Sequence, residues 1–289
     1  MMKWSRRIAV TLLTAVMAAS PAKAWWGDGH ALLAAAGVAA TPAEVPAFFR
    51  AGTDHVAHLS YDPDLFKNRA TPHLYDAEHP EHFFDVELVE GMALPDDRYA
   101  FVEACQRAGV RPQKVGFLPY ALAEWTERLA VAFAEHRRWP DDPVIHSKCL
   151  NYAGFIAHYA ADAAQPLHLT IHFDGRVQED GTVVQKGIHE KVDGLIQAMG
   201  FDPIELGTRA KVVALDSLRS GILAQVHSNR TLIDQVYELG PHLGDLDSAH
   251  VRAFAQDRAV AAASFTASLY LTAWRLSAGI ELPGWHERR

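Results

Sequence analysis

The 289-residue sequence has only two cysteines, Cys105 and Cys149, and it contains no Cys-x-x-Cys motif. Paired motifs of this kind supply the ligands of thiolate zinc sites, so a zinc-finger type of metal site is excluded. Two cysteines allow one disulfide at most. The spacing between them leaves open whether they are bridged.

Long hydrophobic runs are also scarce. One continuous apolar run, residues 8–18, lies near the start of the sequence and is too short to span a membrane comfortably. Three basic residues precede it, and Ala22-Lys23-Ala24 follows it, which is the pattern of a secretory signal peptide with a small-x-small cleavage site. We therefore expect residues 1–24 to be removed after Ala24 and residues 25–289 to be periplasmic or secreted. Whether export is by the general or the twin-arginine route stays open.

The sequence lacks an excess of positive charge. It has 27 Lys and Arg against 35 Asp and Glu, a net charge of −8, and loss of the four basic residues of the signal segment leaves 23 against 35, or −12. Such a chain does not coat nucleic acid by electrostatic attraction alone. An enzyme whose cations are metal ions held inside the site remains compatible with this charge.

Runs of alternating apolar and polar residues are missing, whereas alanine- and leucine-rich amphipathic stretches are long. Their 3.6-residue periodicity predicts a single all-α domain of packed helices. Two irregular regions interrupt it, Tyr61 to Asp97 and Phe173 to Gly187, and the second is expected to form a short hairpin or flap. The predicted helices are His30 to Ala40, Val115 to His136, Val144 to Ala164, His189 to Met199, Ala210 to Glu238, and Ala249 to Ala278.

The most informative motif lies in the central predicted helix. His158 and Asp162 are four residues apart and so share one helix face, and His168 follows Pro166, where the helix has to end. A second pair at the same spacing, His189 and Asp193, comes about thirty residues after the first. An imidazole and a carboxylate on an alanine-rich helix are poor core residues unless they bind something. Two such pairs predict a multinuclear metal site.

Further residues extend this pattern in a familiar order. Together they resemble the zinc-dependent phospholipase C and P1/S1 nuclease superfamily over most of the chain after the signal segment. The resemblance implies an all-α fold that holds three Zn²⁺ ions. The residues that carry it are Trp25, His30, Asp54, His82 in a His-Phe-x-Asp motif, His158, Asp162, His168, His189 and Asp193.

The resemblance also implies three ligand sets. The first zinc would be held by Asp54, His82, His158 and Asp162. The second would be held by the amino group and carbonyl of a processed Trp25, by His30, and by Asp162 as a bridge. The third would be held by His168, His189 and Asp193. The gap from Asp54 to His82 is longer than is usual in the family, and it leaves His73 as an alternative to His82.

A zinc-dependent phosphodiester hydrolase is the function implied by this resemblance. A hydroxide shared by the two zincs that Asp162 bridges would attack phosphorus, with Asp162 and Asp54 as catalytic residues. Phe83 and Asp85 are similar to positions that hold a base in the nuclease branch. We therefore expect a nuclease or phosphodiesterase that acts on single-stranded nucleic acid or nucleotides.

Two alternatives stay open, a zinc-dependent phospholipase C acting on phospholipid and a zinc-binding protein without catalysis. No stable protein partner and no transmembrane segment after residue 24 are expected, and the oligomeric state is left open.

Overall fold

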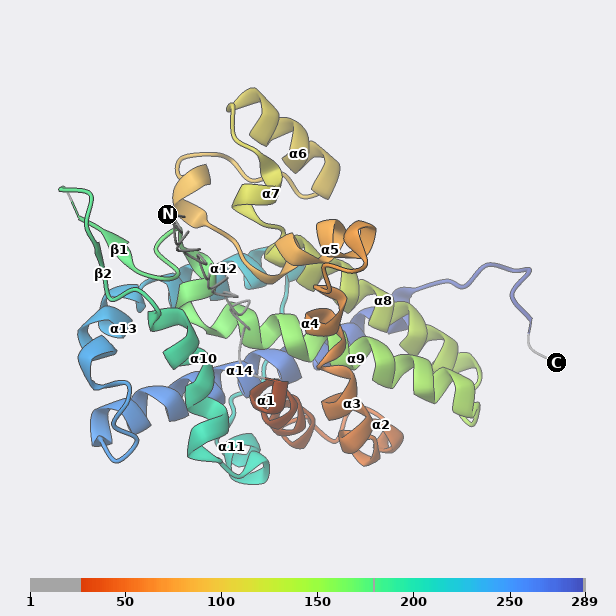
Figure 1. Ribbon diagram of the computed structural model, residues 1–289. Coiled ribbons are helices and arrows are strands. Elements are labelled where there is room, and N and C mark those ends of the chain that lie inside the picture. The colour runs from red at the N-terminus through yellow and green to blue at the C-terminus, as the bar shows by residue number, and fades with distance from the viewer. Residues whose placement is uncertain (1–26, 179, 288–289) are drawn as a thin grey trace, which may run out of the picture.

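A computed structural model describes residues 27–178 and 180–287 (Figure 1). The expected signal peptide and Trp25 therefore lie outside the described residues. Within these ranges no helix is both long and apolar enough to cross a membrane. The elements are α1 (Gly27–Ala39), α2 (Ala47–Ala51), α3 (Thr53–Leu59), α4 (Asp62–Phe66), α5 (Pro72–Glu78), η1 (His79–His82), η2 (Val86–Val89), α6 (Arg98–Arg107), α7 (Pro112–Val115), α8 (Leu118–Arg138), α9 (Pro143–Ala164), η3 (Pro166–Leu169), β1 (Arg176–Val177), β2 (Val183–Val184), α10 (Ile188–Met199), α11 (Pro203–Arg209), α12 (Leu218–Arg230), α13 (Ile233–Leu239), η4 (Gly240–His242), α14 (Ala249–Leu276) and η5 (Ser277–Gly279).

The helix α9 runs through the middle of the fold and packs against α1, α3, α8 and α14 (Figure 1). Its first turn is capped by the side chain of Asp142, which accepts hydrogen bonds from the N–H groups of Val144 and Ile145. It ends at Ala164, because Pro166 cannot continue the helix. The small side chains of its alanines let neighbouring helices approach closely, so the residues of its last turns are surrounded by protein on every side.

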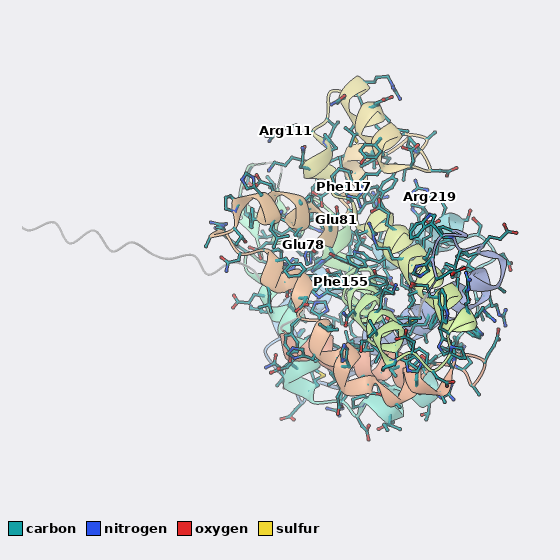
Figure 2. All side chains as sticks on the ribbon, turned by 90° about the vertical axis from the view of Figure 1, so that its right-hand side faces the viewer. Glu78, Glu81, Arg111, Phe117, Phe155 and Arg219 are labelled. Atoms are coloured by element: carbon teal, nitrogen blue, oxygen red, sulfur yellow. The ribbon has the colours of Figure 1, made fainter. Side chains whose placement is uncertain are left out.

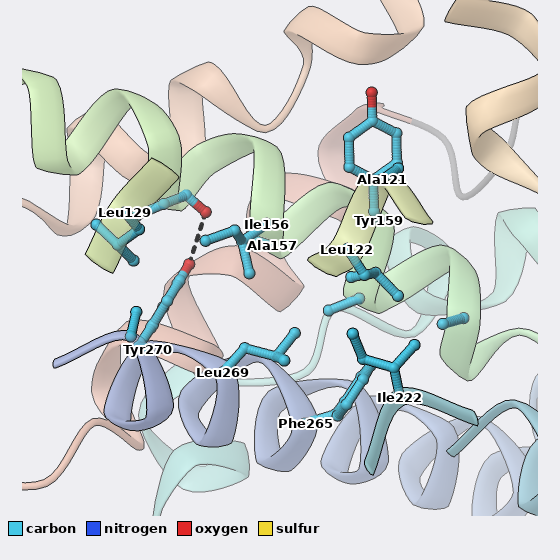
Figure 3. Packing of buried hydrophobic residues seen from close by; sticks show 14 of the residues in the cluster. Ala121, Leu122, Leu129, Ile156, Ala157, Tyr159, Ile222, Phe265, Leu269 and Tyr270 are labelled. Carbon is cyan, nitrogen blue, oxygen red and sulfur yellow. Dashed lines mark hydrogen bonds between the residues drawn. The ribbon is translucent and has the colours of Figure 1, made fainter. Parts of the chain in front are cut away.

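Apolar side chains from α8, α9, α12 and α14 form the main core (Figure 3). Leu122, Ile156, Phe265 and Leu269 are buried there, and burial of each such side chain stabilises the fold by about 1.5–3 kcal/mol. The one polar atom of Tyr270 is satisfied as well, because its hydroxyl donates a 2.8 Å hydrogen bond to the carbonyl of Ala153 (Figure 3). This core holds α9 rigidly.

Gly154 lets α3 lie close to α9. A Cβ atom at this position would meet Leu59 Cβ at 2.6 Å and the Val56 carbonyl oxygen at 3.2 Å. Glycine is therefore required for this approach. The contact places the end of α3, and the chain that follows it, against the last turns of α9.

The predicted all-α domain is confirmed. The expected helices appear as α1, α8, α9, α10 and α14 within a few residues of their predicted bounds, and the region from Phe173 to Gly187 contains the antiparallel hairpin β1–β2. The short helices within the irregular regions were not predicted, and neither were α6 and α11. Their lengths, ten residues or fewer, give weak periodicity.

The single helix predicted for Ala210 to Glu238 is wrong. Residues 210–217 are not helical, and the rest is divided between α12 and α13. The N–H groups of Lys211, Val213 and Leu215 bond to hydroxyls of α14 that are four residues apart, at distances of 2.9–3.2 Å. Hydroxyls one turn apart on α14 thus satisfy alternate N–H groups of this extended segment. These hydrogen bonds outweigh the helix propensity of the segment. The hydroxyls belong to Ser264, Ser268 and Thr272.

The two cysteines lie on different helices, Cys105 on α6 and Cys149 on α9. Both are buried and both thiols are free. The question that the sequence left open is therefore answered against a disulfide.

Candidate metal centre

Three groups of buried or half-buried histidine and aspartate side chains could each hold a metal ion. Within a group, one nitrogen or oxygen from every residue lies within 4.8 Å of the others. Two of the groups share His158, and the third lies beside them, because His168 Nδ1 is 3.6 Å from Asp162 Oδ1. The three groups therefore gather around the last turns of α9. The groups are His30, Asp64 and His158; His82, His158 and Asp162; and His168, His189 and Asp193.

Four donor atoms surround one point between α4, η1 and α9. His82 Nδ1 lies 3.0 Å from His158 Nε2 and 3.0 Å from Asp162 Oδ2, and the last two atoms are 3.3 Å apart. Asp64 Oδ1 is 3.9 Å from each of the two imidazole nitrogens. A tetrahedral zinc with bonds of roughly 2.0–2.1 Å has ligand atoms roughly 3.3–3.4 Å apart. The atoms of His82, His158 and Asp162 are therefore spaced close to what a tetrahedral site requires, and Asp64 Oδ1 lies about half an ångström farther out.

Asp162 faces two of the groups at once. Its Oδ2 belongs to the set just described, whereas its Oδ1 lies 3.5 Å from His30 Nε2. The carboxylate is completely buried, and Oδ1 has no hydrogen-bond partner among the described residues. The ring of His30 stacks on that of His158, with centroids 3.8 Å apart. This geometry matches the bridging position that the sequence predicted for Asp162.

The third group joins the end of α9 to α10. His189 Nε2 lies 3.0 Å from Asp193 Oδ2, one turn apart on α10 as their spacing predicted, and the ring of His168 lies 4.9 Å from that of His189. Gln165 fixes the arrangement, because its side-chain amide donates a 2.9 Å hydrogen bond to Asp193 Oδ1 and its carbonyl accepts one from the N–H of Leu167. The ligand set expected for the third ion, His168, His189 and Asp193, is thus brought together.

The side chains of the centre leave several buried polar atoms without a hydrogen-bond partner in the described part of the chain. A buried polar atom without a partner costs about 1–3 kcal/mol, so a fold that gathers several in one region favours a bound ligand there. Two of these atoms do have an ionic neighbour, Asp64 Oδ1 with Lys67 Nζ at 2.5 Å and Asp193 Oδ2 with His189 Nε2 at 3.0 Å. Atoms of this kind are what a bound cation would satisfy. They are His30 Nδ1 and Nε2, Asp64 Oδ1, His82 Nε2, Asp162 Oδ1, His168 Nε2 and Asp193 Oδ2.

The pKa values of three histidines in the centre favour metal binding. Burial, reinforced by the neighbouring histidines, lowers the pKa of His30 and of His168 well below the usual value, and burial with nearby Lys67 does the same for His82. The three imidazoles are therefore neutral near pH 7. A neutral imidazole offers the lone pair that a metal ligand needs.

In the two His-x-x-x-Asp pairs, the pKa of the histidine is raised, unlike that of His30, His82 and His168. Burial disfavours the imidazolium of His158, but the carboxylates of Asp162 and Asp64 outweigh it and raise its pKa, while burial raises the pKa of Asp162 to about 6. His189 and Asp193 repeat this relation, since both pKa values are raised. In each pair the imidazolium and the carboxylate thus oppose the effect of burial on each other's pKa, and a metal ion would compete with the proton for the imidazole.

The structure does not bring one predicted ligand to the centre. Asp54 lies in the first turn of α3, is exposed, and belongs to none of the three groups. Asp64 on α4 is grouped with His30 and His158 instead, and it also lies 3.9 Å from His82 Nδ1. The helix α3 ends at Leu59, and the turn that follows leads the chain into α4, which lies against α9. The long interval from Asp54 to His82, noted in the sequence, is consistent with a carboxylate nearer to His82.

The two alternative histidines lie in different places. His82 is buried in the centre, whereas His73 lies exposed on α5. His82 is held by its own backbone, since its carbonyl accepts a 2.7 Å hydrogen bond from His168 Nδ1. Trp25 precedes the described residues, so its expected role as an N-terminal ligand is not placed by the structure.

A cavity of about 240 Å³ opens beside the centre. Phe83 and Asp85, predicted to hold substrate, line it together with Phe173, which sequence reasoning had not singled out. Lys67 and Lys114 also line it. The Lys67 ammonium lies 2.5 Å from Asp64 Oδ1 and so brings a positive charge to the metal-facing wall. The full lining is Lys67, His79, His82, Phe83, Asp85, Lys114, Leu167, His168, Phe173 and His189.

Two carboxyl groups near the cavity are protonated more readily than usual. Burial, with the nearby Glu87, raises the pKa of Asp85 to about 7. Burial also raises the pKa of Glu78 to about 7, although the Tyr159 hydroxyl that donates to it acts in the opposite direction. At neutral pH the Asp85 carboxyl can therefore donate or accept a hydrogen bond from a ligand in the cavity.

No profile of a known protein family matches this chain, and no curated protein matches its sequence. The case for a function therefore rests on the residues of the centre and on their geometry.

Proposed function

We propose that the protein is a zinc-dependent phosphodiester hydrolase that cleaves single-stranded nucleic acid or nucleotides. The observation that carries the proposal is the three neighbouring groups of His and Asp donors beside an open cavity lined by aromatic and basic side chains.

Zinc suits this donor set, because imidazole and carboxylate are its usual ligands where no thiolate is present. Asp64, His82, His158 and Asp162 would hold one ion; His168, His189 and Asp193 a second; His30 and Asp162, with donors from the processed N-terminus, a third. When bound, zinc lowers the pKa of a coordinated water and polarises phosphoryl oxygens.

The cavity offers side chains that could bind the base and the phosphate of a substrate. Phe83 and Phe173 give it aromatic surface on which a base can stack, and stacking of this kind contributes about 1–3 kcal/mol per base. The ammonium groups of Lys67 and Lys114 are placed to attract a phosphate, and Asp85 can hydrogen-bond a base edge. Because His82, His168 and His189 reach the cavity wall, a ligand there has access to the metal-binding side chains. This openness favours a catalytic over a closed structural site.

A zinc-dependent phospholipase C is the second candidate, and a specific observation favours it. Large apolar side chains are exposed on or next to the hairpin β1–β2, beside the cavity residue Phe173, which is itself 48 % exposed. A lipid-facing rim would expose such groups. The other exposed side chains are Ile171, Val177, Val183 and Val184.

The two candidates are separated by a direct assay. The protein is produced with residues 1–24 in a secreting host and loaded with Zn²⁺, and its zinc content is measured. Hydrolysis of single-stranded DNA and of phosphatidylcholine vesicles is then followed with and without a chelator. Chelator-sensitive cleavage of the DNA is expected. Cleavage of the vesicles alone would favour the phospholipase, and a zinc-loaded protein inert on both substrates would refute the enzyme.

The substrate assignment has its own control. Phe83→Ala should lower kcat/KM on single-stranded DNA by roughly tenfold to hundredfold, as expected from the loss of about 1–3 kcal/mol of stacking. Tyr99→Ala removes an aromatic ring that is 80 % exposed on α6, away from the cavity, and should leave the rate unchanged. Equal effects of the two variants would argue against base stacking at Phe83.

A further inference from the structure

The histidines of the centre differ in how their outer nitrogen is held. His158 Nδ1 bonds to the carbonyl of Ser60 at 2.7 Å, His168 Nδ1 to the carbonyl of His82 at 2.7 Å, and His189 Nδ1 to the carbonyl of Phe173 at 3.3 Å. Each therefore carries its proton on Nδ1 and turns Nε2 toward the centre. A hydrogen bond of this kind fixes the tautomer and ring orientation of a metal-binding histidine.

His82 is turned the other way. Its Nδ1 points at His158 Nε2 and Asp162 Oδ2, so Nε2 must carry the proton, yet this buried atom has no hydrogen-bond partner within the described ranges. The nearest acidic atom is Oε1 of Glu78, at 3.6 Å, from the last turn of α5. This separation is slightly too long for a hydrogen bond, so the carboxyl group faces Nε2 at the distance of an ion pair.

Glu78 is itself anchored from the far side. The hydroxyl of Tyr159 donates a hydrogen bond to Glu78 Oε1. Tyr159 is almost completely buried on α9, one residue after His158, and its ring lies 5.5 Å from the ring of His82. The carboxylate is thus held between a rigid helix and the imidazole. The labels of Glu78 and Glu81 lie next to each other in Figure 2.

We infer that Glu78, fixed by Tyr159, is a positioning residue that sets the tautomer and orientation of His82 and so tunes one metal site of the centre. The inference rests on the proposed metal-dependent function. The carboxylate does not reach the cavity, so it acts through His82 and does not contact substrate. It takes the role that backbone carbonyls have for His158, His168 and His189.

The test measures metal binding to the full chain. Zn²⁺ affinity is determined by competition with a chelator, and Co²⁺ substituted for zinc reports ligand geometry by its visible absorption. Glu78→Gln and Tyr159→Phe should each weaken one of the sites by about 10–100-fold and change the Co²⁺ spectrum. The site of His168, His189 and Asp193 should bind as in the wild type.

Two matched variants control for loss of stability. Glu81→Gln alters a neighbouring glutamate that pairs with Arg98 and makes no contact with His82, and Tyr270→Phe removes another buried tyrosine hydroxyl. Both should leave zinc affinity and the Co²⁺ spectrum unchanged. Wild-type affinity and spectrum in Tyr159→Phe and in any folded Glu78→Gln would overturn the inference. A wild-type protein that binds no zinc would instead refute the proposed function.

Discussion

Replacement of Asp64 by asparagine should remove one zinc ion, whereas the same change at Asp54 should not. The two aspartates are ten residues apart and chemically identical, so they form a matched pair. Asp64 Oδ1 lies 3.9 Å from both His82 Nδ1 and His158 Nε2, and its side chain is 16 % exposed. Asp54 is exposed on α3 and outside every group of the centre.

The magnitude follows from the charge that is lost. Two unit charges 4 Å apart in a partly buried protein site attract by about 4 kcal/mol, and a carboxylate ligand lies closer than this to a divalent ion. Desolvation of the carboxylate offsets part of the gain. We therefore expect Asp64→Asn to lose at least about 3 kcal/mol, or about a hundredfold in zinc affinity. Asp54→Asn loses only a favourable charge in the first turn of α3, about 0.3–1 kcal/mol of folding stability.

The assay is the zinc content of each purified variant after dialysis against a weak chelator, with the melting temperature as a test of folding. The wild type and Asp54→Asn should retain the same number of ions, and Asp64→Asn should retain fewer. Full zinc content in Asp64→Asn together with loss in Asp54→Asn would show that the assignment of the carboxylate ligand is reversed.

Three further predictions concern stability. Removal of metal by a strong chelator should lower the melting temperature by at least about 5 °C. Several buried donors lose their partner, and each kcal/mol lost from the free energy of unfolding lowers the melting temperature of a chain of this size by about 2–4 °C. An unchanged melting temperature would argue that the metal centre does not stabilise the fold. Asp85→Asn should have no effect on stability below pH 4 and should stabilise the protein by about 1–2 kcal/mol above pH 7. Burial raises the pKa of Asp85 to about 7, so the wild type loses stability as the pH rises toward that value. Melting curves at pH 4 and pH 8 test this sign. Gly116→Ala should destabilise the protein by about 1–3 kcal/mol, because Gly116 has φ +91° and a Cβ there would meet the carbonyl oxygen of Phe83 at 2.0 Å; denaturant unfolding that matches the wild type would contradict it.

Local spacing was enough to predict much of the centre. His158 with Asp162, and His189 with Asp193, each lie one turn apart on a helix, and the structure keeps both pairs. The position of His168 after Pro166 could likewise be predicted, because proline ends a helix and turns the chain. These relations depend only on helix geometry, which a sequence pattern reports directly.

The irregular region from Tyr61 to Asp97 could not be resolved in the same way. It has no periodicity, so no pattern pointed to Asp64. The prediction named Asp54 from the resemblance, and the long interval to His82 was the one sign against it. What decides between the two carboxylates is the turn at Ser60, whose carbonyl accepts the hydrogen bond of His158 Nδ1. Such a contact joins residues 98 apart in the chain, and no local pattern encodes it.

The sequence by itself determined the helical class and the two His-x-x-x-Asp pairs, because these follow from composition and from a period of 3.6. The resemblance to a known family, and no local pattern, pointed to His30 and His82. Only the tertiary structure decided that Asp64 joins the centre, that Asp162 turns one oxygen toward each of two groups, and that Glu78 lies behind His82. Those outcomes depend on how separate helices pack around α9. Packing of this kind is set by the whole core rather than by any single segment.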